Sequence, residues 1–261
     1  MDKTLLKGLT VLEALAGSER PRGITDLAAE LGLVKSNVHR VLKTLESAGY
    51  VTRGRDAATY APSLKLWVLG SQIHARSDLA AEAQPFLQAL AAVSRETVHL
   101  SVLDDRDVIY LAKIDSPEPV RAYTVLGGRA PAHCVATGKV LLAHLPEAQQ
   151  AAQAAGLEAY TPRTITNGAD LLQALAVIRA KGFGVNLGEW RETVRGAAAP
   201  VRNAAGTVLA AVGISGPGER LTQRRISELV PHVVEAAGRI SAALGYRGHT
   251  ERRPQAESIT L

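Results

Sequence analysis

The sequence predicts an α+β fold of two domains, a winged helix-turn-helix over residues 1–62 and a larger domain with an antiparallel-rich sheet over residues 78–246. Two observations lead to this prediction. Three helical patterns followed by a short hairpin have the order of a winged helix-turn-helix. In the second half, strand-like and helical runs mix without strict alternation, which favours an α+β sheet over a doubly wound one. The length of 261 residues suits two modest domains.

Periodic leucines indicate the first helix, over residues 4–16. After a polar break, a second helix begins near Thr25, which we expect to cap its free amide groups, and it ends at Gly32. Ser36 is the expected cap of a third helix, whose apolar stripe faces the core. The hairpin is formed by two short strands, over residues 50–53 and 59–61.

A helix over residues 63–77 follows, which we interpret as a linker between the domains. Apolar periodicity then indicates helices over residues 78–95, 134–144, 147–155, 169–181 and 222–244. Runs rich in β-branched and apolar residues indicate strands over residues 98–103, 108–114, 120–124, 197–202 and 207–214. The polar tail, residues 247–261, is predicted to be flexible.

The composition, with 46% hydrophobic and 21% charged residues, argues against wholesale disorder. A formal net charge of +5 is compatible with a polyanionic partner. The single cysteine, Cys134, excludes an internal disulfide and a cysteine-rich zinc site and suits a reducing cytoplasm. The histidines lack the spacing of a zinc site, so we expect no metal and no other cofactor. Because neither a signal-peptide pattern nor an apolar run of about 18 residues occurs, we expect a cytoplasmic protein that does not cross a membrane.

Short polar and cationic side chains gather on the exposed face of the third helix and in the hairpin. Such side chains bind base edges and phosphates when a recognition helix enters the major groove of DNA. The alternative is a solvated helix face beside a charged hairpin, and the net charge of residues 1–60 is only +2, from nine positive and seven negative side chains. Because the positive charges cluster at the helix start and in the hairpin, we favour DNA binding. The candidate residues are Arg22, Lys35, Ser36, Asn37, His39, Arg40, Lys43, Arg53 and Arg55.

Five sequence motifs follow one another along residues 4–246. They comprise Gly23–Ala28 with Leu31–Ser36, His39–Leu42, Leu45 and Gly49–Val51; Leu126–His133 with Ala136–Ala143; Thr161–Thr166; Gly182–Asn186 with Glu189 and Ala197–Val201; and Val212–Pro217. Each motif alone is weakly specific, but all five in this order resemble the IclR family of bacterial regulators.

The resemblance implies a GAF-like fold for the second domain and a small organic effector bound within it, often a carboxylate or an aromatic catabolite. It also implies a homodimer, or a dimer of dimers, on a roughly palindromic operator in double-stranded DNA. The expected function is a ligand-responsive transcriptional regulator, repressor or activator, of a catabolic operon. An enzyme would need a nucleophile, a base and an orienting group, which we cannot assemble from the sequence. A constitutive DNA-binding protein with a vestigial sensor domain is the third hypothesis.

The resemblance also implies which positions line the effector pocket. Transferred onto this sequence they are Ala130, Ala136, Thr137, Asn186, Val194, Gly196, Gly213 and Ser215. Amide groups at the helix start beside Thr137 would form an anion seat, and Ser215 would donate to a carboxylate. Some family members have an aspartate in place of Asn186 and a serine in place of Gly213, which predicts a larger or less polar ligand here. An aromatic ligand and a small aliphatic acid are equally compatible with the sequence.

Several further residues have two interpretations. Trp190 and Arg191 would either cover an aromatic acid or close the edge of the pocket. Cys134 is interpreted as a small buried residue rather than a catalytic thiol. Lys139 is interpreted as a structural residue or as one that pairs with a carboxylate, rather than as a Schiff-base lysine. The 63–77 helix would pack within the monomer or against a second copy, and we favour the second copy because paired DNA-binding heads need a fixed spacing.

Overall fold

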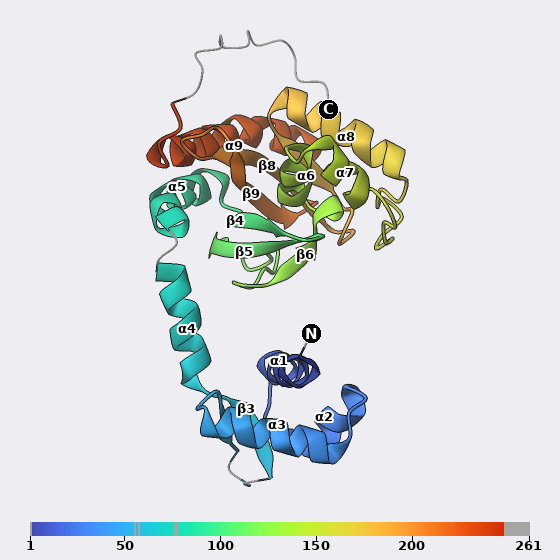
Figure 1. The fold of residues 1–261 in the computed structure, drawn as a ribbon. Helices are drawn as coiled ribbons and strands as arrows, with labels where there is room; N and C mark the ends of the chain where they lie inside the picture. The colour runs from blue at the N-terminus through green and yellow to red at the C-terminus, as the bar shows by residue number, and fades with distance from the viewer. Residues whose placement is uncertain (1, 55, 57, 76–77, 248–261) are drawn as a thin grey trace. The chain divides into compact units, whose positions relative to one another are not determined.

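The computed structural model of the chain describes residues 2–54, 56, 58–75 and 78–247. The chain divides into two compact units, Met1–Ser77 and Asp78–Leu261 (Figure 1). The predicted α+β fold class is confirmed, with a helix-turn-helix in the first unit and an antiparallel sheet covered by helices in the second. Within the described part of the chain, every helix is too short or too polar to cross a bilayer.

The first unit packs three helices on a three-stranded antiparallel sheet and continues into a fourth helix. These elements are α1 (Lys3–Ala16), α2 (Ile24–Glu30), α3 (Lys35–Ser47), α4 (Leu64–Ala75), β1 (Arg22–Gly23), β2 (Val51–Arg53) and β3 (Thr59–Pro62). Strand β3 lies between β1 and β2, so the hairpin is tied to the segment that precedes α2. Leu15, Leu27, Leu42 and Tyr60 are fully buried in the core that the helices and the sheet share.

The helix starts in this unit differ from the sequence prediction. Helix α2 has Gly23 at its N-cap and α3 has Val34, so Thr25 and Ser36 lie inside the first turns and the predicted caps are wrong. The pairing of β1 with β3 holds Gly23 in an extended conformation, and this fixes where α2 begins. At the turn between the two helices, Gly32 has the left-handed conformation (φ 61°) that the sequence predicts for a helix end.

The second unit is built on a six-stranded antiparallel sheet in the order β6-β5-β4-β9-β8-β7. Its strands are β4 (Thr97–Asp104), β5 (Asp107–Ile114), β6 (Arg129–Pro131), β7 (Gly184–Leu187), β8 (Val194–Arg202) and β9 (Val208–Pro217). Its α-helices are α5 (Asp78–Ser94), α6 (Ala136–Ala143), α7 (Glu147–Gln153), α8 (Gly168–Lys181) and α9 (Gln223–Ala243). Figure 1 shows α5 and α9 on one side of the sheet and α6, α7 and α8 on the other. The short strands β1, β6 and β7 are absent from the sequence prediction.

The predicted strand over residues 120–124 is wrong. Residues 115–128 form an irregular segment, because the carbonyl groups of Val120, Ala122 and Thr124 accept hydrogen bonds from side chains rather than from the backbone of a neighbouring strand. Strand β6 occupies the outer edge of β5 only over residues 107–109. The side chains of Thr97, Lys113 and Arg220 hold this 115–128 segment instead, through hydrogen bonds of 3.2, 2.9 and 2.8 Å to its carbonyl groups. Its end also exchanges two backbone hydrogen bonds with Tyr110 of β5, through Gly127 and Gly128. The rest of the segment is attached to the sheet by side chains rather than by a backbone ladder.

Helix α6 is the most enclosed element of the second unit. The predicted helix over residues 134–144 is divided into a 3-10 turn, η1 (Ala132–Cys134), and α6 itself, because Val135 is extended. All eight residues of α6 are buried, and the helix packs on the sheet and on α8. Gly138 permits the close approach of η1 and α6, since a Cβ at this position would overlap the backbone of Ala132.

We predict opposite effects for two glycine-to-alanine substitutions in helices of this unit. Gly138→Ala should lower the free energy of unfolding by about 1–3 kcal/mol, because η1 and α6 must separate to admit the methyl group. Gly238→Ala in α9 should raise it by about 0.5–1 kcal/mol, since its Cβ would meet no other atom of the described chain within 4 Å. Urea denaturation of both variants measures the difference. Equal effects of the two substitutions would contradict the packing of α6 on η1.

Candidate functional site

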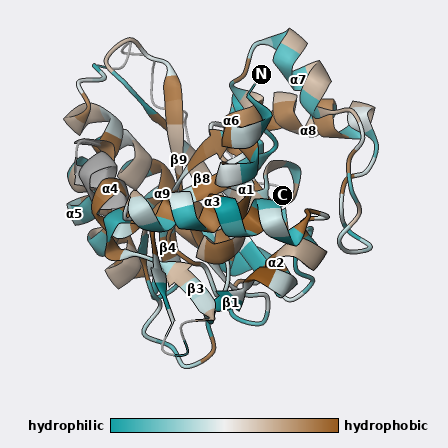
Figure 2. Cartoon of the chain, turned by 60° about the horizontal axis from the view of Figure 1, so that its bottom comes forward, coloured by the Kyte–Doolittle hydropathy of each residue, from teal (hydrophilic) through white to brown (hydrophobic). Residues whose placement is uncertain are grey.

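Helix α3 contains many hydrophilic residues, coloured teal in Figure 2, and they lie on its exposed face. Val38, Val41 and Leu42 bury the opposite face, so the helical repeat turns the intervening positions outward. The predicted DNA-binding residues on this face are Lys35, Ser36, Asn37, His39, Arg40 and Lys43, all exposed except the half-buried Asn37. The guanidinium of Arg40 donates to Asn37 Oδ1 (3.3 Å), which aligns two of these side chains.

Two further candidate arginines form ion pairs within the first unit. Arg22 in β1 pairs with Glu30 at 2.7 Å, and Arg53 in β2 pairs with Glu46 at 3.0 Å. Arg53 also lies over the ring of Tyr60, with 4.9 Å between the guanidinium carbon and the ring centroid. Exposed ion pairs of this kind contribute little to stability and exchange partners readily. The remaining candidate, Arg55, lies outside the described residues.

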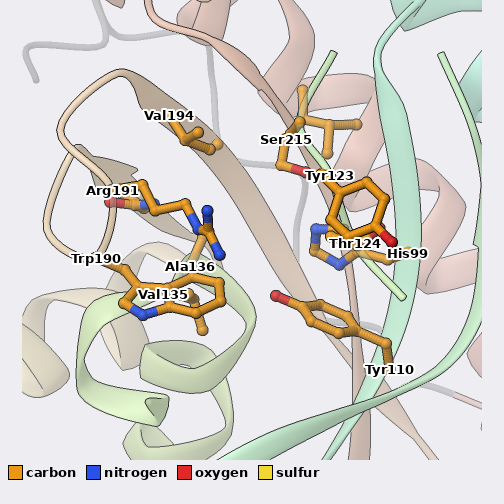
Figure 3. Close-up of a pocket in the computed structure, with 14 residues that line it drawn as sticks. His99, Tyr110, Tyr123, Thr124, Val135, Ala136, Trp190, Arg191, Val194 and Ser215 are labelled. Carbon is orange, nitrogen blue, oxygen red and sulfur yellow. The ribbon is translucent and has the colours of Figure 1, made fainter. Parts of the chain in front are cut away.

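A cavity of about 40 Å³ lies in the second unit between the sheet, the start of α6, the 115–128 segment and the 188–193 loop (Figure 3). Its walls combine aromatic, small apolar and neutral polar side chains. The lining residues are His99, Tyr110, Ala122, Tyr123, Thr124, Val135, Ala136, Asn186, Trp190, Arg191, Val194, Gly196, Ile214 and Ser215.

Arg191 supplies positive charge to the cavity. Its guanidinium stacks on Trp190, with 4.7 Å to the ring centroid, and in Figure 3 it points into the cavity toward Tyr110. Burial raises the pKa of Tyr110 to about 12, an effect that the charge of Arg191 opposes. Burial also lowers the pKa of His99 to about 4, so its imidazole is neutral at physiological pH. None of the lining residues, all of them described, is acidic, so the lining attracts an anion.

Three polar atoms in the cavity walls are buried and have no hydrogen-bond partner within the described chain. They are His99 Nδ1, Thr124 Oγ1 and Ser215 Oγ, from side chains that are 5%, 7% and 9% exposed as residues. An unpartnered buried polar group costs about 1–3 kcal/mol, so each such group in a folded protein requires an explanation. All three line one cavity, which can therefore offer hydrogen bonds to a polar molecule.

Comparison with known families decides what kind of protein carries these two sites. The family model described as the IclR helix-turn-helix domain matches residues 4–55. The model described as the C-terminal domain of the bacterial transcriptional regulator IclR matches residues 71–242. The chain belongs to the IclR family of bacterial transcriptional regulators.

Individual IclR-family relatives cover nearly the whole chain. The HTH-type transcriptional regulator KdgR of Escherichia coli is 36% identical over 248 residues, 94% of each protein. The glycerol operon regulatory protein of Streptomyces coelicolor is 34% identical over 90% of this chain and 91% of its own length. A crystal structure of an IclR homolog from Microbacterium hydrocarbonoxydans in complex with 4-hydroxybenzoate is 26% identical, has a TM-score of 0.82 and covers 93% of this chain and 99% of that one.

The predicted family and its function class are therefore confirmed. This IclR-family protein is a ligand-responsive, DNA-binding transcriptional regulator and not an enzyme. Its Cys134 is buried, and burial raises the pKa of the thiol to about 12, which removes the thiolate that nucleophilic chemistry needs. Among the described residues, no group of three histidine, cysteine, aspartate or glutamate side chains is arranged to hold a metal ion.

The structure places the eight predicted effector residues in two groups. Five of them line the cavity, namely Ala136, Asn186, Val194, Gly196 and Ser215. The other three, Ala130, Thr137 and Gly213, are absent from its described lining. A Cβ at Gly213 would lie 2.9 Å from Thr137 Cγ2, so α6 fills the room that the glycine leaves. Gly213 therefore adds no room to the cavity in this structure, and the larger or less polar ligand inferred from it stays a prediction.

The sequence prediction did not include several lining residues. His99 and Tyr110 lie on the neighbouring strands β4 and β5, and their rings meet edge to face with 5.0 Å between centroids. Tyr123 and Thr124 come from the 115–128 segment. One signal was present in the sequence, because His99 stands between the apolar residues Val98 and Leu100 of a predicted strand, and a buried histidine requires a polar surrounding.

The 188–193 loop, which carries Trp190 and Arg191, is fastened by three hydroxyl or amide side chains. Thr161 donates to Gly188 O (2.7 Å) and Thr164 to Glu189 O (2.6 Å). Asn186 Oδ1 accepts from the amides of Gly188 (3.0 Å) and Glu189 (2.9 Å). The Thr161–Thr166 motif and Asn186 therefore hold the loop at the cavity.

A buried ion pair completes this attachment. Lys139 Nζ in the middle of α6 donates to Glu189 Oε1 at 2.6 Å, and the side chains are 5% and 11% exposed. This confirms the interpretation that Lys139 pairs with a carboxylate. Burial raises the pKa of Glu189, and the neighbouring ammonium opposes that shift. The negative charge of Glu189 is thus compensated by Lys139. The positive charge of Arg191 is therefore available to a ligand in the cavity.

We predict that Lys139→Met lowers the free energy of unfolding by about 3–5 kcal/mol, because it leaves the Glu189 carboxylate buried without a cation. The pKa of an isolated buried carboxyl is raised in the folded state, so its penalty disappears as pH falls below that pKa. The loss measured by urea denaturation should accordingly be smaller at pH 5 than at pH 8. The double variant Lys139→Met/Glu189→Gln should recover part of the loss, and a double variant as unstable as the sum of the single changes would contradict the pairing.

Proposed function

We propose that this IclR-family protein is a cytoplasmic homodimer that binds a roughly palindromic operator and responds to a small organic anion. The exposed face of α3 supports the DNA-binding part of the proposal. It combines cationic side chains, which donate hydrogen bonds to guanine, with an asparagine amide, which pairs with adenine. The residues proposed to contact bases are Lys35, Ser36, Asn37, His39, Arg40 and Lys43. Arg22, Arg53 and Arg55 are proposed to contact phosphates, for which Arg22 and Arg53 would leave their exposed glutamate partners.

We predict that Arg40→Ala weakens specific operator binding by about 5- to 150-fold, the loss of a base contact of about 1–3 kcal/mol. The measurement is a gel-shift titration at fixed salt, with the DNA that flanks the gene or with a site selected from random duplexes. Arg224→Ala is the matched control, because it removes an arginine that is 91% exposed on α9 in the other unit. Equal affinities of the two variants for the operator would exclude Arg40 from the interface.

The dimer part of the proposal is supported by apolar surface on two helices of the first unit. Leu64 and Trp67 of α4 are 80% and 70% exposed, and Val68 and Leu69 lie beside them on the same helix, 43% and 37% exposed. Helix α1 exposes Leu5, Leu6 and Leu9. Apolar patches of this kind mark protein interfaces in folded proteins. A second copy is the proposed occupant, because a palindromic operator requires two heads at a fixed spacing.

We predict that Trp67→Asp weakens the dimer by at least tenfold, because exposed tryptophans that become buried are frequent energetic centres of interfaces. Sedimentation velocity over a concentration series measures the shift toward monomer. Val34→Asp is the control, since Val34 is an exposed apolar residue of the same unit (65%) that lies in the turn before α3. An unchanged sedimentation profile of the Trp67 variant would place the dimer contact elsewhere.

The effector part of the proposal rests on the cavity. The eight effector residues inferred from the family are proposed to act there in two ways: five line it, while Ala130, Thr137 and Gly213 support its wall. Arg191 and the acid-free lining favour a carboxylate ligand, as does the related structure in complex with 4-hydroxybenzoate. The name of the glycerol operon relative supports a catabolic operon as the target. For regulation, repressing or activating, the ligand must bind two states of the dimer with free energies that differ by about 1–3 kcal/mol.

A further inference from the structure

Two opposite walls of the cavity differ in chemistry (Figure 3). Arg191 and Trp190 approach from the 188–193 loop. His99, Thr124 and Ser215 approach from β4, the 115–128 segment and β9, and each brings a buried polar atom without a partner in the described chain. The first wall is cationic and the second is neutral and rich in hydrogen-bonding groups.

The neutral wall suits a hydroxyl group better than a second carboxylate. A neutral imidazole has one nitrogen that donates a hydrogen bond and one that accepts. A ligand hydroxyl can both donate and accept, and the hydroxyls of Thr124 and Ser215 can do the same. A carboxylate would lose its hydration against a wall that holds no cation, because His99 is buried and uncharged. The two walls together therefore discriminate a hydroxy-monoacid from a diacid.

The surfaces between these walls are aromatic and apolar. Tyr110 and Tyr123 present rings, and small apolar residues such as Ala122, Val135 and Ala136 complete the lining. Rings of this kind pack against planar ligands by stacking or by edge-to-face contact. The surfaces between the two walls therefore suit a planar, apolar body.

We propose that the effector is a planar monocarboxylate with a hydroxyl group, whose carboxylate binds Arg191 and whose hydroxyl is recognised by His99, Thr124 and Ser215. This inference rests on the proposed effector function of the same cavity and adds the polarity and the specificity residues of the ligand. The described cavity of about 40 Å³ accommodates water but is smaller than the roughly 150 Å³ in which benzene binds a protein interior, so one wall must shift. The 115–128 segment is that wall, because apart from its end at Gly127 and Gly128 it is attached to the sheet by side chains rather than by a strand ladder.

The test is isothermal titration calorimetry of the full-length protein with benzoate, 3- and 4-hydroxybenzoate, and benzene-1,4-dicarboxylate. At least one hydroxybenzoate should bind tenfold or more tightly than benzoate, because its hydroxyl satisfies polar groups that benzoate leaves unpartnered. The dicarboxylate should bind more weakly than that hydroxybenzoate. Arg191→Gln should weaken the binding of all four acids.

Two conservative variants separate ligand recognition from a structural role. Thr124→Val and Ser215→Ala remove hydroxyls that make no bond to the described chain, so the melting temperature of the free protein should stay the same or rise. Both should reduce the advantage of the hydroxybenzoate over benzoate and leave benzoate affinity unchanged. A lower melting temperature together with an unchanged advantage would show a structural role and overturn the inference.

The remaining outcomes distinguish this inference from the proposed function. If benzoate and the hydroxybenzoates bind equally and Arg191→Gln weakens them all, the anion site stands and the recognition of a hydroxyl is wrong. If the dicarboxylate binds as tightly as the best hydroxybenzoate, the neutral wall does not exclude charge and the inference is also wrong. If none of the four acids binds while operator binding is intact, both the ligand class and its orientation are overturned and the DNA-binding function remains.

Discussion

The buried ion pair between Lys139 and Glu189 is the contact on which the arrangement of the second unit depends. Helix α6 is enclosed on all sides, and its central ammonium needs a carboxylate, because an unpaired buried charge is strongly destabilising. The carboxylate comes from the 188–193 loop, which also carries Trp190 and Arg191. A requirement of the core thus fixes the position of the cation that faces the cavity, and the hydroxyls of Thr161 and Thr164 restrict the loop further.

The sheet serves as core on one face and as cavity wall on the other, which follows from the alternation of side chains along its strands. In β4, Val98 and Leu100 join the apolar cluster with α5 and α9, whereas His99 and Ser101 face the side of α6. The unpartnered polar atoms on that side reduce stability, since each lacks the hydrogen bond that would compensate its burial. The large apolar cluster on the opposite face of the sheet offsets this loss of stability. One sheet can therefore form both a stable core and a cavity whose polar groups lack hydrogen bonds.

Much of the fold follows from sequence periodicity, whereas boundaries and long-range contacts do not. The stripe of Val38, Val41 and Leu42 predicts both the burial and the exposed face of α3, because a helix repeat alone determines them. The start of α2 depends on the pairing of β1 with β3, and the 120–124 strand fails because distant side chains bond the carbonyl groups of this segment. Five family positions line the cavity, but no local pattern shows that Tyr110 lies beside His99 across two strands, or that Thr137 fills the space at Gly213.

The ion pairs of the first unit reduce the affinity that its arginines can contribute to operator binding. Because Glu30 and Glu46 pair with Arg22 and Arg53, a phosphate must displace a carboxylate to gain either arginine, and the net electrostatic gain is smaller than the count of cations suggests. A single DNA-binding domain with a net charge of only +2 over residues 1–60 would bind any DNA weakly, which disfavours retention at random sites. Two heads joined in one dimer bind the second half-site at a high effective concentration, so their combined affinity exceeds that of either head without new contacts. If the apolar surfaces of α1 and α4 form the proposed dimer contact, they govern operator affinity as strongly as the arginines, because the second DNA-binding domain is present only in the dimer.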